Sequence, residues 1–484
     1  MSETTETARP AVRSRFPFLD RGTPRLLAAS MLALFMAALD QTIVGPVLAD
    51  ILAEFGGGAL LAWVPTGFLL VAMVAAPLYG AVADIQGRRF ALLLANVLFL
   101  GGSIACALAP SLWLLVLARL LQGAGAGGLV SIPFIIVADR VPMSRRPLFS
   151  AFISTIYAVA GLAGPLAGGA LAEYMSWRWV FWINLPACLL VWYGVQTALA
   201  PRAASRGRQI DWTGAFLLLC ASVPLLLIFT GGEAGAEAAG PLLPVPVLGA
   251  LSALFWGLFA WRMLRAKDPL IPVKVLTNRS ILLASLGLAC CGGANIGLAV
   301  YLPLYFQKFH GLSASEAGMT LLAMISGGLV GAYIPPQILR FYPSYKPLMV
   351  GSALGAAISG LALTWIMAGQ PTLGALLLPM WIMGLCIGLL FPIFPLVVQN
   401  AAEPVQMGSA IGVLSFLRSM GGTVGVSIIG MMAVGSGLAV DILPDDPLPI
   451  WSLGAAAAGI MMVAFLGLSC LPNRKLEGFG RARR

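Results

Sequence analysis

Two ionisable side chains lie deep inside apolar stretches that are long enough to cross a lipid bilayer. Asp40 occurs in MAALDQTIVGPVLADI, and Arg119 occurs in LARLLQGAGAGG. A charge at the centre of a bilayer costs from about 2.5 to more than 10 kcal/mol unless it faces a cavity or an opposite charge. Both residues therefore need a partner or a function. For Arg119 the alternative is an arginine that snorkels to the lipid surface.

The depths of Asp40 and Arg119 favour a pair. At about 1.5 Å per helical residue, Asp40 lies about 21 Å from the start of its stretch, and Arg119 lies about 12 Å from the start of a stretch that runs the opposite way. In an apolar core about 30 Å thick these depths coincide. The two side chains could form an ion pair that protonation of Asp40 would open. A static structural ion pair is the alternative.

Two glycine-rich segments could bring helices close together. The first is a short turn in GAVADIQGRRFALLL, which carries Gly80, Asp84, Gly87, Arg88 and Arg89. Its aspartate, at a helix end, could pair with arginines of a neighbouring loop. The alternative is a tight turn whose arginines only follow the positive-inside bias.

The second segment reads GLAGPLAGG and carries Gly161, Gly164, Pro165, Gly168 and Gly169. Small residues every three or four positions make a smooth helix face, and a proline inside a helix removes a hydrogen bond and kinks it. Physically, this pattern predicts a closely packed, bent helix.

The C-terminal part of the chain carries one intramembrane charge, Arg418, in GVLSFLRSMGGTVGVSIIG. No acid lies inside the neighbouring apolar stretches. Arg418 could bond backbone carbonyls or polar groups such as Gln399 and Asn295, or it could face an anionic substrate. The candidate residues of a substrate cavity are Gln122, Tyr157, Asn295, Tyr305 and Arg418; for the aromatic ones the alternative is the interfacial belt.

The composition indicates that membrane-spanning helices position these residues. Of 484 residues 59% are apolar, and 10% are charged against about 25% in soluble domains, with a mean hydropathy of +0.93. These values exclude a soluble globular enzyme. The chain divides into fourteen apolar stretches, and we expect an all-α integral membrane protein with fourteen transmembrane helices. The stretches are 26–49, 60–83, 90–109, 111–138, 148–172, 178–200, 211–230, 243–264, 280–303, 316–338, 346–368, 372–398, 407–434 and 449–471.

The basic residues alternate with these stretches. Almost all of them fall in the two tails and in every second loop, whereas the loops between hold only Arg178 and Lys308. The positive-inside rule therefore predicts that both termini are cytoplasmic. The same rule explains the net charge of +10 without nucleic acid as a partner. Residues 1–25 resemble a cytoplasmic tail rather than a signal peptide.

Several kinds of chemistry lack the residues they need. No lysine follows a glycine, so a phosphate-binding GxxxxGK[ST] loop is absent, which argues against ATP as the direct energy source. One histidine and seven scattered cysteines do not form a recognisable zinc, haem or iron–sulfur site. We expect no cofactor, no metal and no enzymatic activity.

The stretches predict five regions of the chain. Residues 1–25 form a cytoplasmic tail, 26–200 an N-terminal six-helix half, 201–279 two additional helices with cytoplasmic linkers, 280–471 a C-terminal six-helix half, and 472–484 a basic cytoplasmic tail. Transporters with two six-helix halves commonly bind substrate near the membrane midplane, between the halves.

Four N-terminal motifs together resemble the major facilitator superfamily, in its fourteen-span drug:proton antiporter branch. Residues 80–94 are similar to the family's signature loop, and residues 161–169 to its antiporter motif. LDQTIVGPVLADI and WRWVFWINLPACLL also resemble that branch, although Gly45 and Pro46 replace its usual Asn-Val pair. The resemblance implies a major facilitator fold, a gating role for the 80–94 loop, and proton coupling through Asp40 and Arg119.

The resemblance predicts a multidrug efflux transporter in a bacterial inner membrane. It would export small amphipathic or lipophilic compounds, such as drugs and toxins, in exchange for protons, and its partners would be the substrate, protons and the bilayer. A single membrane acid predicts poor export of dications. The alternative is a dedicated exporter of one metabolite or natural product, anionic ones included. More distant alternatives are an integral membrane enzyme or a scaffold. The sequence identifies no periplasmic adaptor.

Overall fold

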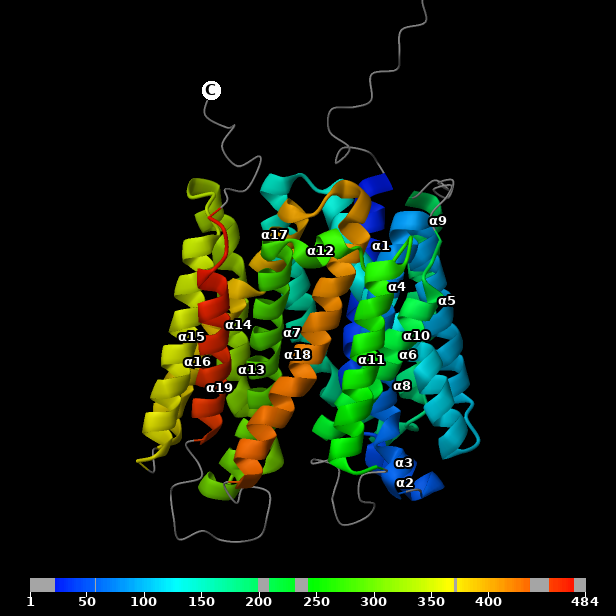
Figure 1. The fold of residues 1–484 in the computed structure, drawn as a ribbon. Helices are drawn as coiled ribbons and strands as arrows, with labels where there is room; N and C mark the ends of the chain where they lie inside the picture. The colour runs from blue at the N-terminus through cyan, green and yellow to red at the C-terminus, as the bar shows by residue number, and fades with distance from the viewer. Residues whose placement is uncertain are drawn as a thin grey trace, which may run out of the picture.

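The computed structural model describes residues 22–56, 58–198, 209–230, 243–369, 372–435 and 452–473. Within these residues the chain forms long helices that run side by side between two end faces and contains no strand (Figure 1). The predicted tails, 1–25 and 472–484, lie almost entirely outside the described residues. The all-α class expected from hydropathy is confirmed.

Every predicted apolar stretch of the described chain is helical. The long helices before residue 200 are α1 (Gly22–Ile43), α4 (Trp63–Ile85), α5 (Arg88–Ala107), α6 (Leu112–Arg140), α7 (Arg146–Tyr174) and α9 (Asn184–Ala198). The central pair is α10 (Trp212–Thr230) and α11 (Val245–Arg265). The later helices are α13 (Arg279–His310), α14 (Ala314–Phe341), α15 (Lys346–Met367), α16 (Leu373–Leu390), α17 (Ile393–Ala401), α18 (Met407–Gly435) and α19 (Ser452–Ser469).

Thirteen helical segments of the described chain are long and apolar enough to cross a membrane. The remaining predicted stretch, 211–230, corresponds to α10, a shorter apolar helix that packs against its neighbour α11. An ion pair joins the end of α11 to the start of α10. Arg262 Nη2 of α11 lies 3.1 Å from Oδ1 of Asp211, the residue before α10.

Two predicted stretches are interrupted at a proline. The stretch 26–49 ends as a helix at Ile43, because Pro46 has no backbone N–H and Gly45 favours a turn. A short helix, α2 (Leu48–Phe55), follows that turn. The stretch 372–398 is divided into α16 and α17 at Phe391–Pro392, where Pro392 precedes the first residue of α17.

The helices pack in two groups that contact each other along a few of their members. In the first group α1 packs on α7 and α9, and α6 packs on α4 and α5. In the second group α13 packs on α18, α14 on α16, and α15 on α19. Helices α4 and α7 of the first group contact α18 and α14 of the second, and α10 packs against both α4 and α18. In Figure 1 the blue and cyan helices lie on one side and the yellow and red ones on the other.

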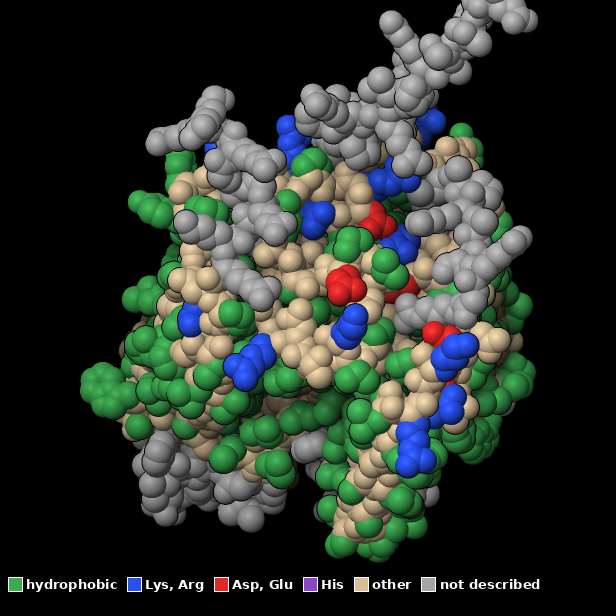
Figure 2. All heavy atoms as spheres, turned by 45° about the horizontal axis from the view of Figure 1, so that its top comes forward, with side chains coloured by type: hydrophobic (Ala, Val, Ile, Leu, Met, Phe, Trp, Pro, Cys, Tyr) green, Lys and Arg blue, Asp and Glu red, His purple; other side chains and the backbone are tan. Residues whose placement is uncertain are grey.

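The two end faces differ in charge. We call the end at which α1 begins and α19 ends the basic face, and the opposite end, which carries α2, the distal face (Figure 1). Figure 2 shows lysine and arginine side chains spread across the basic face. Its described basic residues include Arg88, Arg89, Arg140, Arg145, Arg146, Arg262, Arg265, Lys274, Arg279, Arg340 and Lys346.

Candidate functional site

Asp40 and Arg119 meet inside the first group of helices. Arg119 Nη1 of α6 donates to Asp40 Oδ2 of α1 at 2.5 Å, and each residue is 1% exposed. The antiparallel directions of α1 and α6 bring the two positions to one depth, as their distances from the helix starts predict. The expected pair therefore forms, and it is sealed from solvent.

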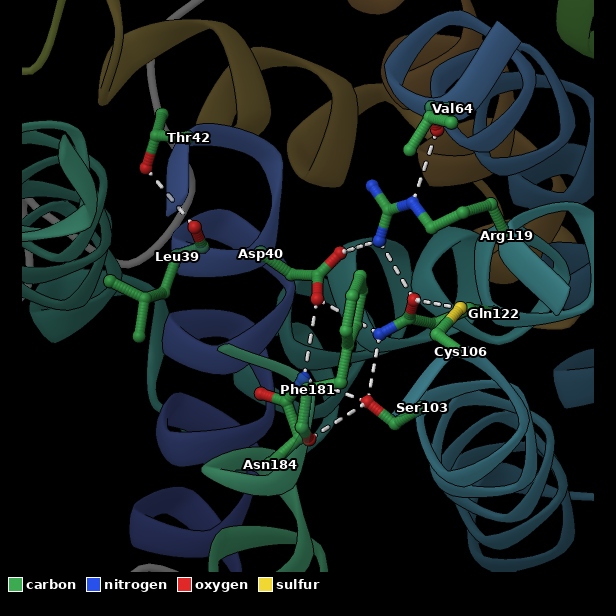
Figure 3. Close-up of polar contacts among 10 residues, drawn as sticks. All are labelled: Leu39, Asp40, Thr42, Val64, Ser103, Cys106, Arg119, Gln122, Phe181 and Asn184. Atoms are coloured by element: carbon green, nitrogen blue, oxygen red, sulfur yellow. Dashed lines mark hydrogen bonds and ion pairs between the residues drawn. The ribbon is translucent and has the colours of Figure 1, made fainter. Parts of the chain in front are cut away.

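Two amide side chains complete the surroundings of Asp40. Gln122 Nε2 of α6 and Asn184 Nδ2 of α9 both donate to Asp40 Oδ1, at 2.8 and 3.2 Å. The same two nitrogens donate to Ser103 Oγ of α5 at 2.9 and 2.8 Å, so these side chains point toward one another (Figure 3). Three donors thus converge on Asp40, which matches a carboxylate that only accepts hydrogen bonds.

Arg119 makes two further hydrogen bonds beside the one to Asp40. Its Nε donates to the carbonyl of Val64 at 3.1 Å, and its Nη1 also donates to Gln122 Oε1 at 2.7 Å. The guanidinium lies 4.0 Å from the centre of the Phe68 ring. Removing the charge of Asp40 would leave a buried cation without its counter-charge, which is a strong penalty in a dry interior. The charge of Asp40 therefore stabilises Arg119 at this position.

Sequence reasoning missed Ser103 and Asn184 in this network. Asn184 lies in the WRWVFWINLPACLL motif, and Ser103 is a polar residue within an apolar stretch. Gln122 was expected at a substrate cavity, but it is fully buried in the network, one helical turn from Arg119.

The 80–94 loop contacts the second group of helices at the basic face. Asp84 Oδ1 accepts a hydrogen bond from the backbone N–H of Gly408 at 3.0 Å, and Oδ2 accepts from the backbone N–H of Ser409 at 3.0 Å. Because α18 begins at Met407, the carboxylate lies at the positive end of that helix. Gly80 faces Gly408 so closely that a Cβ on either residue would collide with the other's backbone.

The arginines of this loop bind within the first group. Arg88 Nε donates to Asp139 Oδ2 at 2.8 Å, and its Nη1 lies 3.4 Å from Asp84 Oδ1. Arg89 donates to Gln196 of α9. Gly87 has φ 93°, a left-handed conformation that other residues rarely adopt. The loop is thus held on one group while Asp84 reaches the other.

The residues of the GLAGPLAGG segment divide into two sets. Gly164 packs directly on Thr42 of α1, and Gly168 packs on the backbone of Ile43, so a Cβ at either position would collide. Gly161 and Gly169 have open space where a Cβ would lie. Pro165 lies inside α7, in this segment. Close helix packing explains Gly164 and Gly168, and their contact is with the helix that carries Asp40.

A cavity of about 260 Å³ lies between the two groups of helices. Two of the expected lining residues, Tyr157 of α7 and Arg418 of α18, do line it, and the Arg418 guanidinium lies 3.9 Å from the centre of the Tyr157 ring. Leu226 brings α10 into the wall. The lining residues are Gln41, Thr66, Leu69, Leu70, Ala72, Met73, Ala76, Gly127, Val130, Tyr157, Leu226, Ile296, Ser415, Arg418, Ser419, Gly422, Thr423, Val426 and Ser427.

Two other expected lining residues lie elsewhere. Tyr305 is buried near the distal end of α13, where its ring stacks on Phe309 at 5.2 Å between centroids. Asn295 precedes the lining residue Ile296 and is not part of the wall. Gln399, a proposed partner of Arg418, donates instead to the carbonyl of Phe134 at 3.1 Å.

A polar cluster at the distal face was not expected to have a role. Arg178 donates through both terminal nitrogens to the Glu54 carboxylate, at 2.7 and 2.6 Å, and Trp177 Nε1 donates to Glu54 Oε2 at 2.7 Å. These hydrogen bonds lower the pKa of Glu54 to about 2, and those from Arg178 contribute most. The cluster ties α2 to the segment that precedes α8 (Trp179–Trp182).

Comparison with known proteins identifies the family. The profile of the Major Facilitator Superfamily matches residues 30–426, most of the chain. The chain belongs to the major facilitator superfamily. Multidrug resistance protein 3 of Bacillus subtilis (strain 168) is 31% identical over 400 residues, which cover 83% of this chain and 77% of the relative. Multidrug transporter protein MdtP of the same organism is 29% identical over 424 residues, covering 88% and 77%.

A solved structure agrees with the major facilitator fold. The proton:xylose symporter XylE, bound to 6-bromo-6-deoxy-D-glucose, matches with a TM-score of 0.67 at 15% identity, over 94% of this chain and 98% of its own. At this identity the likeness concerns the fold alone. This major facilitator protein is thus a multi-pass membrane transporter and not an enzyme.

Proposed function

We propose that this transporter is a proton-coupled exporter of small amphipathic compounds, with Asp40 as its proton-binding residue. The observation that carries the proposal is the buried network around Asp40, in which an ionisable pair is connected to three helices of the first group. Ionisable groups at this depth are expensive, and in transporters they commonly serve ion pathways. The multidrug names of two relatives support export of lipophilic compounds.

The basic face would lie in the cytoplasm of a bacterial cell, at its inner membrane. Positive residues gather on cytoplasmic loops, and the described basic side chains gather on this face (Figure 2). Both termini would then be cytoplasmic. Acidic Glu54 and Glu173 would lie outside.

The two groups of helices would act as the rocking halves of alternating access, residues 26–200 and 280–471. Contacts from Asp84 to α18 and from Gln399 to Phe134 join the groups at the basic face. The conformation is then one that is closed toward the cytoplasm. Opening toward the cytoplasm would require Asp84 to leave the start of α18, so residues 80–89 would act as the gate.

A packed path connects Asp40 to the cavity. Thr42, two residues after Asp40, donates to the carbonyl of Ala160 on α7 at 3.0 Å, and Gly164 packs against it. Tyr157 lies one turn before Ala160 and lines the cavity. We infer that a change at Asp40 moves α1 against α7 and so reaches Tyr157. Proton and substrate would then each lower the affinity for the other by the same factor.

Substrate-induced proton release from the purified full chain in detergent tests this function. Lipophilic cations, anions and neutral compounds are added to the parent, to Asp40→Asn and to a control, Glu173→Gln, which neutralises an exposed acid. We expect release in the parent and in the control and none in Asp40→Asn. Binding without proton release in the parent would contradict proton antiport.

One observation favours a dedicated exporter as the second candidate. The cavity of about 260 Å³ is smaller than most sites for drug-sized ligands, which span about 300 to 1,000 Å³. Competition among chemically unrelated compounds for proton release separates the two candidates. A multidrug exporter accepts several classes, whereas a dedicated exporter responds to one.

A further inference from the structure

The central cavity has a single charged side chain among the described residues of its wall, and that side chain is Arg418. Its guanidinium makes no ion pair and no hydrogen bond with another residue that the structure describes; its one polar contact there is the Tyr157 ring. Asp40 does not balance this charge, because it is buried behind the wall and paired with Arg119. A cation in a largely apolar cavity without a counter-charge favours an anion as its partner.

The contact with Tyr157 leaves the donors of Arg418 available. The cation–π contact places the guanidinium carbon 3.9 Å from the ring centre and occupies no hydrogen-bond acceptor, so the N–H groups of Arg418 can still bind a ligand. Those N–H groups match the geometry of a carboxylate, sulfonate or phosphate.

The rest of the wall suits an amphipathic molecule. The side chains of Gln41 on α1 and Thr66 on α4 offer further polar donors, and neither side chain forms a hydrogen bond with another described residue. Leu70, Met73 and Leu226 supply apolar surface beside them. No carboxylate of the described chain lines this wall, so a lipophilic cation would meet Arg418 with nothing to offset the repulsion.

We propose that the cavity binds small organic anions, with the anionic group on Arg418 and a flat apolar body against Tyr157. This proposal rests on the proposed export function and names its substrate class. Arg418 is the residue that determines the preferred charge, and Tyr157 the residue that orients its guanidinium.

Binding of three naphthalene probes to the purified full chain tests the proposal. Naphthalene-2-sulfonate, naphthalene-2-sulfonamide and naphthalen-2-yl-trimethylammonium share one ring system and differ in charge. Affinities are measured by titration calorimetry against matched empty micelles, for the parent, Arg418→Gln and Arg418→Lys. Arg340→Gln, which removes an exposed charge at the basic end of α14, is the control.

We expect the parent and the control to bind the sulfonate most tightly. Arg418→Gln should weaken sulfonate binding by about tenfold or more, because a hydrogen bond to a charged group is lost, and should change sulfonamide binding far less. Arg418→Lys should keep the preference for the anion with a lower affinity. If Arg418→Gln does not fold, the order of the three probe affinities in the parent and in Arg418→Lys still tests the proposal.

Two results would overturn the proposal. One is equal or tighter binding of the trimethylammonium probe by the parent, and the other is an equal loss for all three probes in Arg418→Gln. Failure of proton coupling gives a different pattern. The sulfonate would then still bind through Arg418 but would release no proton from the parent.

Discussion

At the scale of single residues, the Asp40–Arg119 pair explains why two charges are retained inside the membrane. Asp40 accepts from Arg119, Gln122 and Asn184, and each of these donors comes from a helix of the first group. Such a network is stable only while every member keeps its partners. It therefore acts as a structural constraint that joins α1, α6 and α9, and under the proposed function the same network would bind one proton.

Substitution of the pair separates its structural and transport roles. Arg119→Leu should destabilise the protein by about 3–5 kcal/mol, because it leaves Asp40 as an unpaired buried charge. The double variant Asp40→Leu/Arg119→Leu should recover most of that stability and still release no proton. Thermal unfolding in detergent and substrate-induced proton release measure the two effects. Proton release by the double variant would contradict the assignment of Asp40.

Glu54 gives the distal face its own pH dependence. Its pKa in the folded protein, about 2, is below the ordinary value for a glutamate, so the pair with Arg178 stabilises the protein above the ordinary pKa. That stabilisation is lost as the pH falls from about 4.5 toward 2. Because both side chains are partly exposed, the effect should be about 0.2–1 kcal/mol.

Thermal unfolding of the parent and of Glu54→Gln checks this effect. The difference in unfolding temperature between the two should be present near pH 6 and should shrink as the pH falls toward 2. A difference that does not change with pH would show that the hydrogen bond from Trp177, rather than the charge of Glu54, stabilises this face.

At the scale of helices, the contact between α1 and α7 connects the network to the cavity. Gly164 and Gly168 let the two backbones approach, and Thr42 donates across the contact to Ala160. The same helix, α7, carries Tyr157 into the cavity wall. The glycines of α7 therefore maintain a contact through which α1 can act on the cavity wall.

Alanine substitutions within one motif test that contact. Gly164→Ala should destabilise the protein by about 1–3 kcal/mol and reduce transport, since the new methyl group would collide with Thr42. Gly161→Ala is the matched control, because open space surrounds its Cβ position. Unfolding temperature and proton release of the two variants check the prediction. Equal effects at both positions would exclude the contact as the cause.

At the scale of the whole molecule, the proposed function implies that the charge of the substrate determines which part of the proton motive force would drive export. Exchange of one entering proton for one leaving monoanion moves two charges in the favourable direction, each worth about 2.3 kcal/mol per 100 mV. Exchange of one entering proton for a neutral compound moves only one charge. The membrane potential should therefore affect anions more than neutral molecules.

Transport by proteoliposomes checks this consequence. Dissipating the membrane potential with valinomycin and potassium, at a constant pH gradient, should slow export of naphthalene-2-sulfonate more than export of the sulfonamide. An equal response of the two probes would contradict anion export coupled to proton entry.

Hydropathy and charge in the sequence determined most of the architecture. The all-helical membrane class follows because residues in a bilayer must satisfy their backbone hydrogen bonds internally. The apolar stretches predict most helix ends to within about four residues, but α1 ends six residues before its stretch does and α13 continues seven residues past its stretch. The equal depth of Asp40 and Arg119 follows from a fixed rise per residue and two opposite directions. The sequence also contains the signal for the turn at Gly45–Pro46, because a proline without a backbone N–H cannot continue the hydrogen bonds of the helix.

The tertiary structure alone decided which side chains share an environment. Gln122, Ser103 and Asn184 join Asp40 through contacts between helices far apart in the sequence, and no spacing in the chain encodes such contacts. Tyr157 and Arg418 meet across the cavity, whereas Tyr305 turns to its neighbours on α13. Sequence periodicity fixes the depth of a side chain and the face of its helix, but the partner on the facing helix depends on how helices pack, which is a property of the folded molecule.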